Sequence, residues 1–324
     1  MTNWLSGEHC ESSTLVNMLR PRGIDVSEPM VFGLGRGLSF LYWHSKQMPA
    51  PFLGGRVKPD HLMRNATRAL GVELRESETT SQAKAERELL ADLDAGEVVG
   101  LKLDRFHLDY AEDSYHFAAH YLACVGHEDG TYTVVETQGL GVRTTSLESV
   151  ARARAAKGPM SSRSLAFRLG RSGYDPARLP DACREAVTET ARAFLEPPIT
   201  NMGYKGFEKA SKAVRGWCDT LDDPAAAFSF LSHSIEDGGT GGGFFRTLWA
   251  DFLDEAAGLT GEASWREAAA TYRGLSARWT RIAELLADET DPAVLRKAAD
   301  DVAGVLAELG PAERDVMEKL AGTP

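Results

Sequence analysis

The sequence predicts an α+β domain with a small antiparallel sheet, followed by an all-helical domain. Segments with the apolar runs or the alternation typical of β-strands all lie before residue 172. From residue 176 onward the chain is rich in Ala, Arg, Glu and Leu and keeps a helical spacing of apolar residues. A length of 324 residues also suits two domains. We therefore expect a first domain over residues 1–172 and a second domain over residues 173–324.

The first domain is expected to open with a helix that carries a cysteine in its first turn. In this helix, residues 9–20, the apolar face would be formed by Leu15, Val16, Met18 and Leu19. The spacing of apolar residues predicts further helices over residues 60–70, 81–94 and 147–156.

Short apolar or alternating segments predict the strands of the sheet. Two of them, residues 120–126 and 131–137, flank the polar residues 127–130 and therefore predict a hairpin with a four-residue loop. The other strands are expected at residues 72–76, 97–104 and 164–170.

Proline and glycine interrupt the helical domain at two places. Pro197 and Pro198 mark one break, and the glycines between residues 238 and 243 mark another. The glycine segment is either backbone that approaches a ligand or a flexible connector, so Gly239 and Gly242 are candidate binding residues. Arg246 follows this segment as a candidate ligand for a phosphate or carboxylate, with a surface ion pair as the alternative.

Composition excludes several classes of function. A net charge of −11 argues against nucleic-acid binding, which needs a basic surface. The sequence contains no apolar run of about 18 residues and no signal-peptide pattern at its start, so no membrane segment is expected. The cysteines are too scattered for a disulfide framework, which predicts free thiols and a cytoplasmic location; they are Cys10, Cys124, Cys183 and Cys218.

A thiol at the start of a helix is a candidate nucleophile. The free N–H groups and the dipole of the helix N-terminus stabilise a thiolate at Cys10. A buried structural cysteine is the alternative interpretation.

A histidine and an acid on the predicted hairpin complete a candidate Cys-His-acid site. His120 begins its strand and is the candidate general base, and His116 competes with it for this role. Glu136, near the end of the paired strand, is the candidate for the group that orients the imidazole. A surface carboxylate at a strand end is the alternative for Glu136.

A metal site is not predicted, although histidines are concentrated in this part of the chain. No partner cysteines or regularly spaced carboxylates complete the set, which consists of His107, His116, His120 and His127.

The order of these motifs resembles two related groups of proteins. The run His120-Tyr-Leu-Ala-Cys-Val-Gly126 followed by Glu136 resembles the histidine and acid blocks of papain-like bacteriocin-leader peptidases. The closer resemblance is to the family of butirosin biosynthesis protein H, and it spans the chain in two blocks. It rests on His9-Cys10-Glu11-Ser12, Ser27-Glu28, the glycine-rich segment 32–40, Asp104 with Tyr110, and the glycine-rich segment 235–246.

The resemblance implies a papain-like cysteine-protease fold for residues 1–172 and an acyltransferase activity. The founding member of the family moves an aminoacyl group from an acyl carrier protein thioester to an amine of an aminoglycoside. Carried over, Cys10 is the nucleophile, His120 the base and Glu136 the orienting acid, where the family usually has Asp. The implied partners are an acyl carrier protein or another thioester donor and a small-molecule amine acceptor, with no cofactor. A homo-oligomer is left open.

The remaining candidates concern binding. Papain-like peptidases carry an oxyanion-hole Gln before the cysteine, where Trp4 stands here, so Asn3 is the nearby amide candidate. Glu28 belongs to the family motif. Tyr42 is a candidate pocket wall, with core packing as the alternative.

Two rival functions are compatible with the same residues. A thioesterase, cyclase or peptidase differs from a transferase only in the nucleophile that reaches the acyl-enzyme. A binding or scaffold protein with a relict site is the non-catalytic alternative. The spacing Gly33-x-Gly35-x-Gly37 does not predict a nucleotide site because it lacks the strand-loop-helix context.

Overall fold

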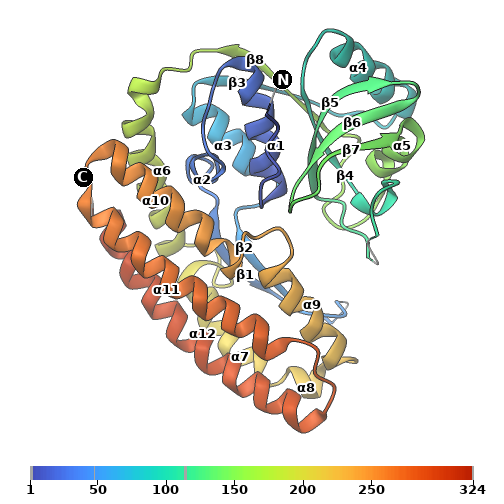
Figure 1. The fold of residues 1–324 in the computed structure, drawn as a ribbon. Helices are drawn as coiled ribbons and strands as arrows, with labels where there is room; N and C mark the ends of the chain where they lie inside the picture. The colour runs from blue at the N-terminus through green and yellow to red at the C-terminus, as the bar shows by residue number, and fades with distance from the viewer. Residues whose placement is uncertain (1–2, 47, 113–114, 323–324) are drawn as a thin grey trace. The chain divides into compact units, whose positions relative to one another are not determined.

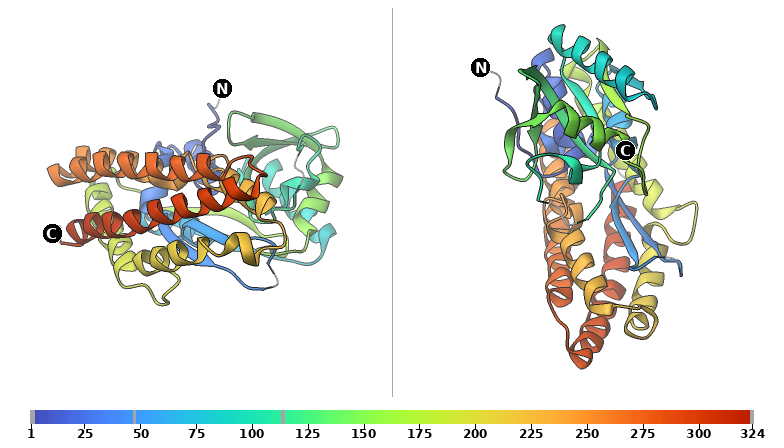
Figure 2. Two further views of the ribbon diagram at one scale, coloured as in Figure 1. Left: turned by 90° about the horizontal axis from the view of Figure 1, so that it is seen from below. Right: turned by 90° about the vertical axis from the view of Figure 1, so that its right-hand side faces the viewer.

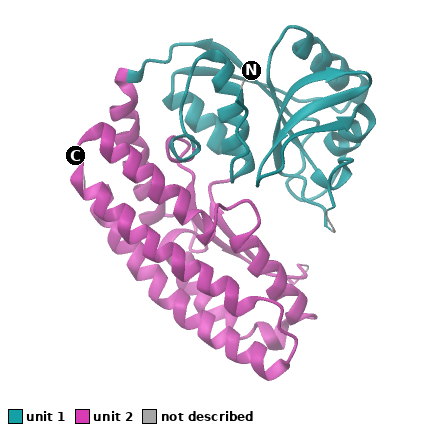
Figure 3. Ribbon diagram, in the orientation of Figure 1, with its two compact units in different colours: residues 1–31, 59–176 teal, residues 32–58, 177–324 magenta. Residues whose placement is uncertain are grey.

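A computed structural model of the chain describes residues 3–46, 48–112 and 115–322. The chain forms two compact units, one of residues 1–31 and 59–176 and the other of residues 32–58 and 177–324 (Figure 3). The predicted class is confirmed, with small antiparallel sheets in the N-terminal half and a helical C-terminal region. The second unit includes residues 32–58, which were predicted to belong to the first domain.

The first unit is built on a six-stranded antiparallel sheet (Figure 1). The strand order is β3-β8-β4-β5-β6-β7, so the last strand of the unit lies between β3 and β4. The bounds are β3 (Val72–Ser77), β4 (Val99–Leu103), β5 (His120–Glu128), β6 (Thr131–Glu136), β7 (Gly141–Ser146) and β8 (Ala166–Ser172).

Helices cover both faces of this sheet. On one face, apolar residues of α4 (Gln82–Asp94) and α5 (Leu147–Ala155) pack against Leu101, Leu122 and Val134 of the central strands. Alternate residues of a strand point to the opposite face, where Gly100 lies so close to α1 (Cys10–Leu19) that a Cβ atom would be 2.8 Å from the Met18 sulfur. Helix α3 (His61–Ala69) also belongs to this unit.

The β5–β6 hairpin differs from its prediction. The strands pair as far as Glu128 and Thr131, so the loop has two residues rather than four. Its residues Asp129 and Gly130 have φ angles of 46° and 76°. An Asp-Gly pair tolerates these positive φ angles, and such turns match the twist of a hairpin. The prediction was wrong because polar residues at 127 and 128 are compatible with an exposed strand end.

The second unit consists of helices around a two-stranded sheet. The sheet, β1 (Leu38–Trp43) with β2 (Phe52–Arg56), was not predicted, since glycines precede β1 and interrupt the apolar pattern of β2. Phe40 of β1 stacks on Phe207 at a centroid distance of 3.8 Å, and Phe207 contacts Trp279. These contacts explain why residues 32–58 belong to the helical unit: their partners lie more than 150 positions later.

Seven helices of the second unit follow residue 176, in the part of the chain that is described. Two of them, α11 and α12, lie side by side in Figures 1 and 2. The short helix α2 (Glu28–Leu34) leads from the first unit into the second. The bounds of the seven are α6 (Leu179–Leu195), α7 (Gly203–Val214), α8 (Trp217–Thr220), α9 (Pro224–Glu236), α10 (Arg246–Thr260), α11 (Ala263–Leu286) and α12 (Pro292–Ala321).

Over the described ranges of the chain, none of the helices combines the length and the apolar character that crossing a bilayer requires.

Candidate functional site

The candidate nucleophile is the first residue of helix α1. His9 caps this helix through its ring nitrogen Nδ1, which accepts a hydrogen bond from the Ser12 backbone N–H at 3.4 Å. Cys10 therefore lies in the turn whose backbone N–H groups have no partner within the helix and favour a negative charge. Its side chain is buried, with 9% of the residue surface exposed.

The chain before Cys10 is held in place by the buried carboxylate of Glu28. One carboxylate oxygen accepts a hydrogen bond from the backbone N–H of Glu8. The other accepts hydrogen bonds from the backbone N–H of His9 and from the Ser12 hydroxyl, and all three distances are 2.8–2.9 Å. Burial nevertheless raises the pKa of Glu28 above its ordinary value, with these hydrogen bonds opposing the shift. Glu28 is therefore a support for the turn that presents Cys10, whereas the sequence suggested it only as part of a binding motif.

His120 and Glu136 lie together in the first unit. The ring nitrogen Nε2 of His120 is 3.0 Å from both carboxylate oxygens of Glu136, and both side chains are buried. Cys10 is the other side chain that acts on the His120 ring, and it helps to raise the pKa of His120. Because Nε2 is taken by Glu136, Nδ1 is the ring nitrogen left for the sulfur. The three side chains thus form the series sulfur, imidazole, carboxylate.

The electrostatics of this series favour a protonated imidazole. Burial alone disfavours the imidazolium, but the charge of Glu136 and the hydrogen bonds with Cys10 and Glu136 outweigh it and raise the pKa of His120 to about 10. Burial likewise disfavours the Glu136 carboxylate, yet the attraction of His120 and the hydrogen bonds it receives lower the pKa of Glu136. An imidazolium beside a thiol stabilises the thiolate form.

Two further residues contact Glu136, and no role was predicted for either of them from the sequence. The Tyr110 hydroxyl donates to Glu136 Oε1 at 2.8 Å, and Arg105 Nε is 3.8 Å from the same oxygen. Both residues come from the segment between β4 and β5, which includes the short 3₁₀ helix η2 (Arg105–His107). Tyr110 was part of the family motif, so its position was visible in the sequence, but its contact was not.

Removing the charge of Glu136 is expected to lower the pKa of His120. In Glu136→Gln the amide keeps a hydrogen-bond acceptor but loses the charge attraction, which is the largest cause that raises this pKa. An NMR titration of the imidazole signals should show wild-type His120 still protonated at pH 8 and the variant losing its proton at lower pH. Equal titration midpoints in the two proteins would mean that Glu136 does not tune His120.

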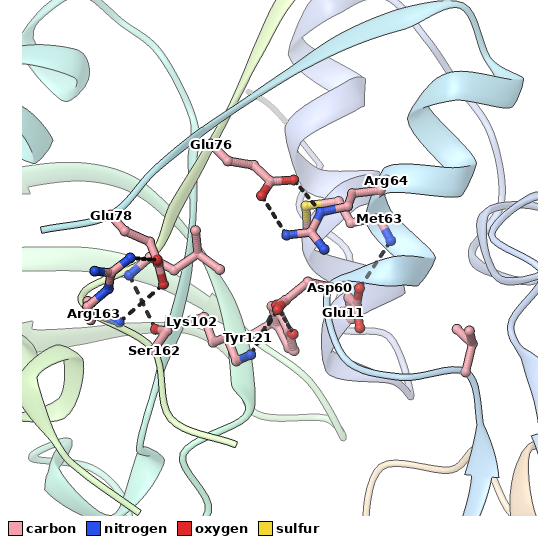
Figure 4. Close-up of polar contacts among 12 residues, drawn as sticks. Glu11, Asp60, Met63, Arg64, Glu76, Glu78, Lys102, Tyr121, Ser162 and Arg163 are labelled. Carbon is pink, nitrogen blue, oxygen red and sulfur yellow. Dashed lines mark hydrogen bonds and ion pairs between the residues drawn. The ribbon is translucent and has the colours of Figure 1, made fainter. Parts of the chain in front are cut away.

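A second polar cluster fixes the register of the strand that bears His120 (Figure 4). Lys102 and Tyr121 are paired across β4 and β5, one position from the pair Leu103 and His120. The Lys102 ammonium is 3.1 Å from both carboxylate oxygens of Asp60, which also accepts the Tyr121 hydroxyl. Since a slip of one residue would turn these buried groups to the wrong face, the cluster holds His120 on the face shared with Glu136.

The same region ties α3 to the helix of the nucleophile. Glu11 is fully buried, and its carboxylate accepts the backbone N–H of Met63 at the start of α3 (Figure 4). An ion pair between Arg64 and Glu76 then joins α3 to β3.

The remaining binding candidates have other contacts. Asn3 is exposed, and its carbonyl accepts a hydrogen bond from Arg20. Tyr42 belongs to the second unit, where its ring stacks against Trp217 at a centroid distance of 6.4 Å.

The glycine segment and Arg246 are also internal to the second unit. Gly239 and Gly242 have φ angles of 74° and 76° in the turn between α9 and α10, which explains these glycines without a ligand. The Arg246 guanidinium is fully buried and makes two parallel hydrogen bonds of 2.9 Å to Glu313. The ion pair expected for Arg246 is thus present, but it lies in the core rather than at the surface.

His116, the competing base, is paired elsewhere. Its Nδ1 lies 2.8 Å from Asp104 Oδ2, and its side chain is 61% exposed. Asp104 and His116 gather with His107 into one group, although the spacing in the sequence predicted no metal site.

Comparison with known proteins gives two family matches. Residues 9–137 match the family described as butirosin biosynthesis protein H, N-terminal, and this range contains Cys10, His120 and Glu136. Residues 148–320 match the family described as domain of unknown function (DUF4872). No curated protein matches the chain.

Proposed function

The chain belongs to the butirosin biosynthesis protein H family, and we propose that it is a cysteine-dependent acyltransferase of natural-product biosynthesis. The family suggests an enzyme related to butirosin biosynthesis. The observation that carries the finer proposal is the buried series of Cys10, His120 and Glu136, in which His120 contacts both other side chains.

In the first half-reaction the Cys10 thiolate attacks the carbonyl carbon of an acyl thioester. A new bond forms between this carbon and the Cys10 sulfur, and the bond to the donor's sulfur breaks. The donor's sulfur takes the proton of the His120 imidazolium and leaves as a thiol. One thioester replaces another, so the step is nearly balanced in energy, and the backbone N–H of Cys10 is suited to stabilise the oxyanion.

In the second half-reaction an amine attacks the acyl-enzyme. His120, now neutral, takes the proton of the attacking nitrogen while the C–N bond forms. The C–S bond to Cys10 then breaks, which restores the thiolate and the imidazolium. Glu136 stays ionised throughout and holds the ring by its Nε2–H. Arg105 and Tyr110 support the Glu136 charge, so they are positioning residues in this proposal.

The substrates follow from the family resemblance. We propose an acyl carrier protein, or another thioester, as donor and a small-molecule amine as acceptor, in the cytoplasm. Water in place of the amine would make the same residues a thioesterase, so the assay must separate transfer from hydrolysis.

A covalent acyl-enzyme tests the proposal directly. Incubation with an acyl-N-acetylcysteamine thioester, followed by intact mass measurement, should show one acyl group per chain, and peptide mapping should place it on Cys10. Added amine should discharge it as the amide. The adduct should be absent in Cys10→Ala and retained in Cys124→Ala, because Cys124 is buried and burial raises its pKa to about 12.

Each alternative has a distinct result in this assay. An adduct that yields only the free acid in the presence of amines would identify a hydrolase. An adduct on Cys124 would overturn the assignment of Cys10 as nucleophile. So would the absence of any adduct after donors with several different acyl groups have been tried.

A further inference from the structure

We propose that Asp104, His107 and His116 form a binding site for a divalent transition metal ion, of which Zn²⁺ is the best fit. This site is separate from the proposed acyl-transfer series and does not depend on it. The carboxylate oxygen and the two imidazole nitrogens that these residues offer all lie within 4.8 Å of one another.

Asp104 is built to present one of its oxygens. The residue is 2% exposed and follows directly on β4, in the buried core of the first unit. Its Oδ1 accepts the backbone N–H groups of Phe106 and Phe117 at 3.2 and 3.1 Å. These bonds fix the plane of the carboxylate, and the other oxygen, Oδ2, is directed to His116. A metal-binding carboxylate that is itself held by hydrogen bonds is typical of metal sites.

The two imidazoles belong to the segment between β4 and β5, in which His107 comes early and His116 comes late. The rings of His107 and His116 have centroids 5.5 Å apart, and the ring of Phe106 packs on His116 at 4.1 Å. His107 is half-buried and His116 exposed, so an ion reaches the group without opening the core.

The donor set determines the class of ion. Two imidazole nitrogens and one carboxylate oxygen suit Zn²⁺ and neighbouring transition metals rather than Ca²⁺ or Mg²⁺, which prefer oxygen alone. With bonds of about 2.0–2.2 Å, two ligand atoms of a tetrahedral zinc lie about 3.4 Å apart. The 2.8 Å hydrogen bond between His116 and Asp104 therefore has to open by about 0.6 Å as the ion replaces the shared proton.

An ion bound to these three residues would link the two ends of the segment that contains the supports of Glu136. Arg105 and Tyr110, which contact Glu136, lie between the first and last of the three ligands in the sequence. The ion would join the buried end of this segment, Asp104, to its exposed end, His116. We therefore assign the metal a structural role and leave a fourth position for water.

Metal titration of the full-length protein tests this site. The protein should carry no polyhistidine tag, and Cys10→Ala should serve as the background, because a reactive thiol beside an imidazole also binds zinc. Calorimetric titration with Zn²⁺ should give one ion per chain, and Zn²⁺ should raise the thermal midpoint of unfolding. Loss of one ligand, in His107→Ala or His116→Ala, should weaken binding by more than about 10-fold.

Two further variants make the result specific. Asp104→Asn keeps an oxygen for the backbone N–H groups but loses the anionic ligand, so its zinc affinity should also fall while its circular dichroism stays native. His127→Ala removes a histidine at the far end of β5, where it pairs with Asp94, and should bind zinc like the parent. Absence of a one-to-one site in the parent overturns the proposal, as does unchanged affinity in both His107→Ala and His116→Ala.

Discussion

Replacing His120 by Gln is expected to slow acylation of the enzyme by a thioester about 10²–10⁴-fold. Gln fills similar space and still donates a hydrogen bond, but it neither carries the positive charge that stabilises the Cys10 thiolate nor transfers a proton. The series depends on both properties, since His120 links the sulfur to Glu136. Stopped-flow measurement of thiol release from an acyl-N-acetylcysteamine donor gives this rate for a single turnover.

A matched control is available on the same strand. His127 lies at the other end of β5, is paired with Asp94, and is outside the series. His127→Gln should acylate within about 2-fold of the wild-type rate, as expected for a surface position. If His120→Gln acylates as fast as His127→Gln while both proteins are folded, His120 is not the base, and the proposed chemistry has to be assigned to other residues.

The pairing of His120 with Glu136 was predictable because it depends on local signals. Both residues lie far from the Asp129–Gly130 turn, at the same end of one hairpin. The contact with Cys10 was predictable only through the order of motifs, because it joins residues 110 positions apart. Its role in catalysis stays a prediction until the acyl-enzyme is tested.

The supports of the site were not predictable in the same way. Glu28, at the start of α2, and Arg105 and Tyr110, between β4 and β5, act through contacts with residues distant in the sequence, which leave no periodic signal. The gathering of Asp104 with His116 was missed for a similar reason, because the residues are 12 positions apart and meet only when the loop folds back. The assignment of β1 to the second unit was missed because the partners of Phe40, namely Phe207 and Trp279, come much later in the chain.

Replacing Arg246 by Met is expected to lower the free energy of unfolding of the second unit by about 3–5 kcal/mol. Arg246 and Glu313 are both fully buried and joined by two hydrogen bonds. Methionine fills part of the volume but leaves the Glu313 carboxylate in the core without its counter-charge. Urea unfolding followed by tryptophan fluorescence measures the loss, because Trp249, Trp265 and Trp279 are buried in this unit.

A surface control separates two contributions to this loss of unfolding free energy: the unpaired Glu313 charge in the core, and the loss of an ion pair in general. Arg273 pairs with Asp251 and Asp254 at the surface of the same unit, with 48% of its side chain exposed. Arg273→Met should therefore cost less than about 1 kcal/mol.

The double variant Arg246→Met with Glu313→Leu should recover part of the loss, because no charge remains to be desolvated. Recovery stays incomplete, since Glu313 also accepts the Trp279 indole N–H and Arg246 donates to the Phe244 carbonyl. A loss in Arg246→Met no larger than that in Arg273→Met would contradict the assignment of Arg246 to the core.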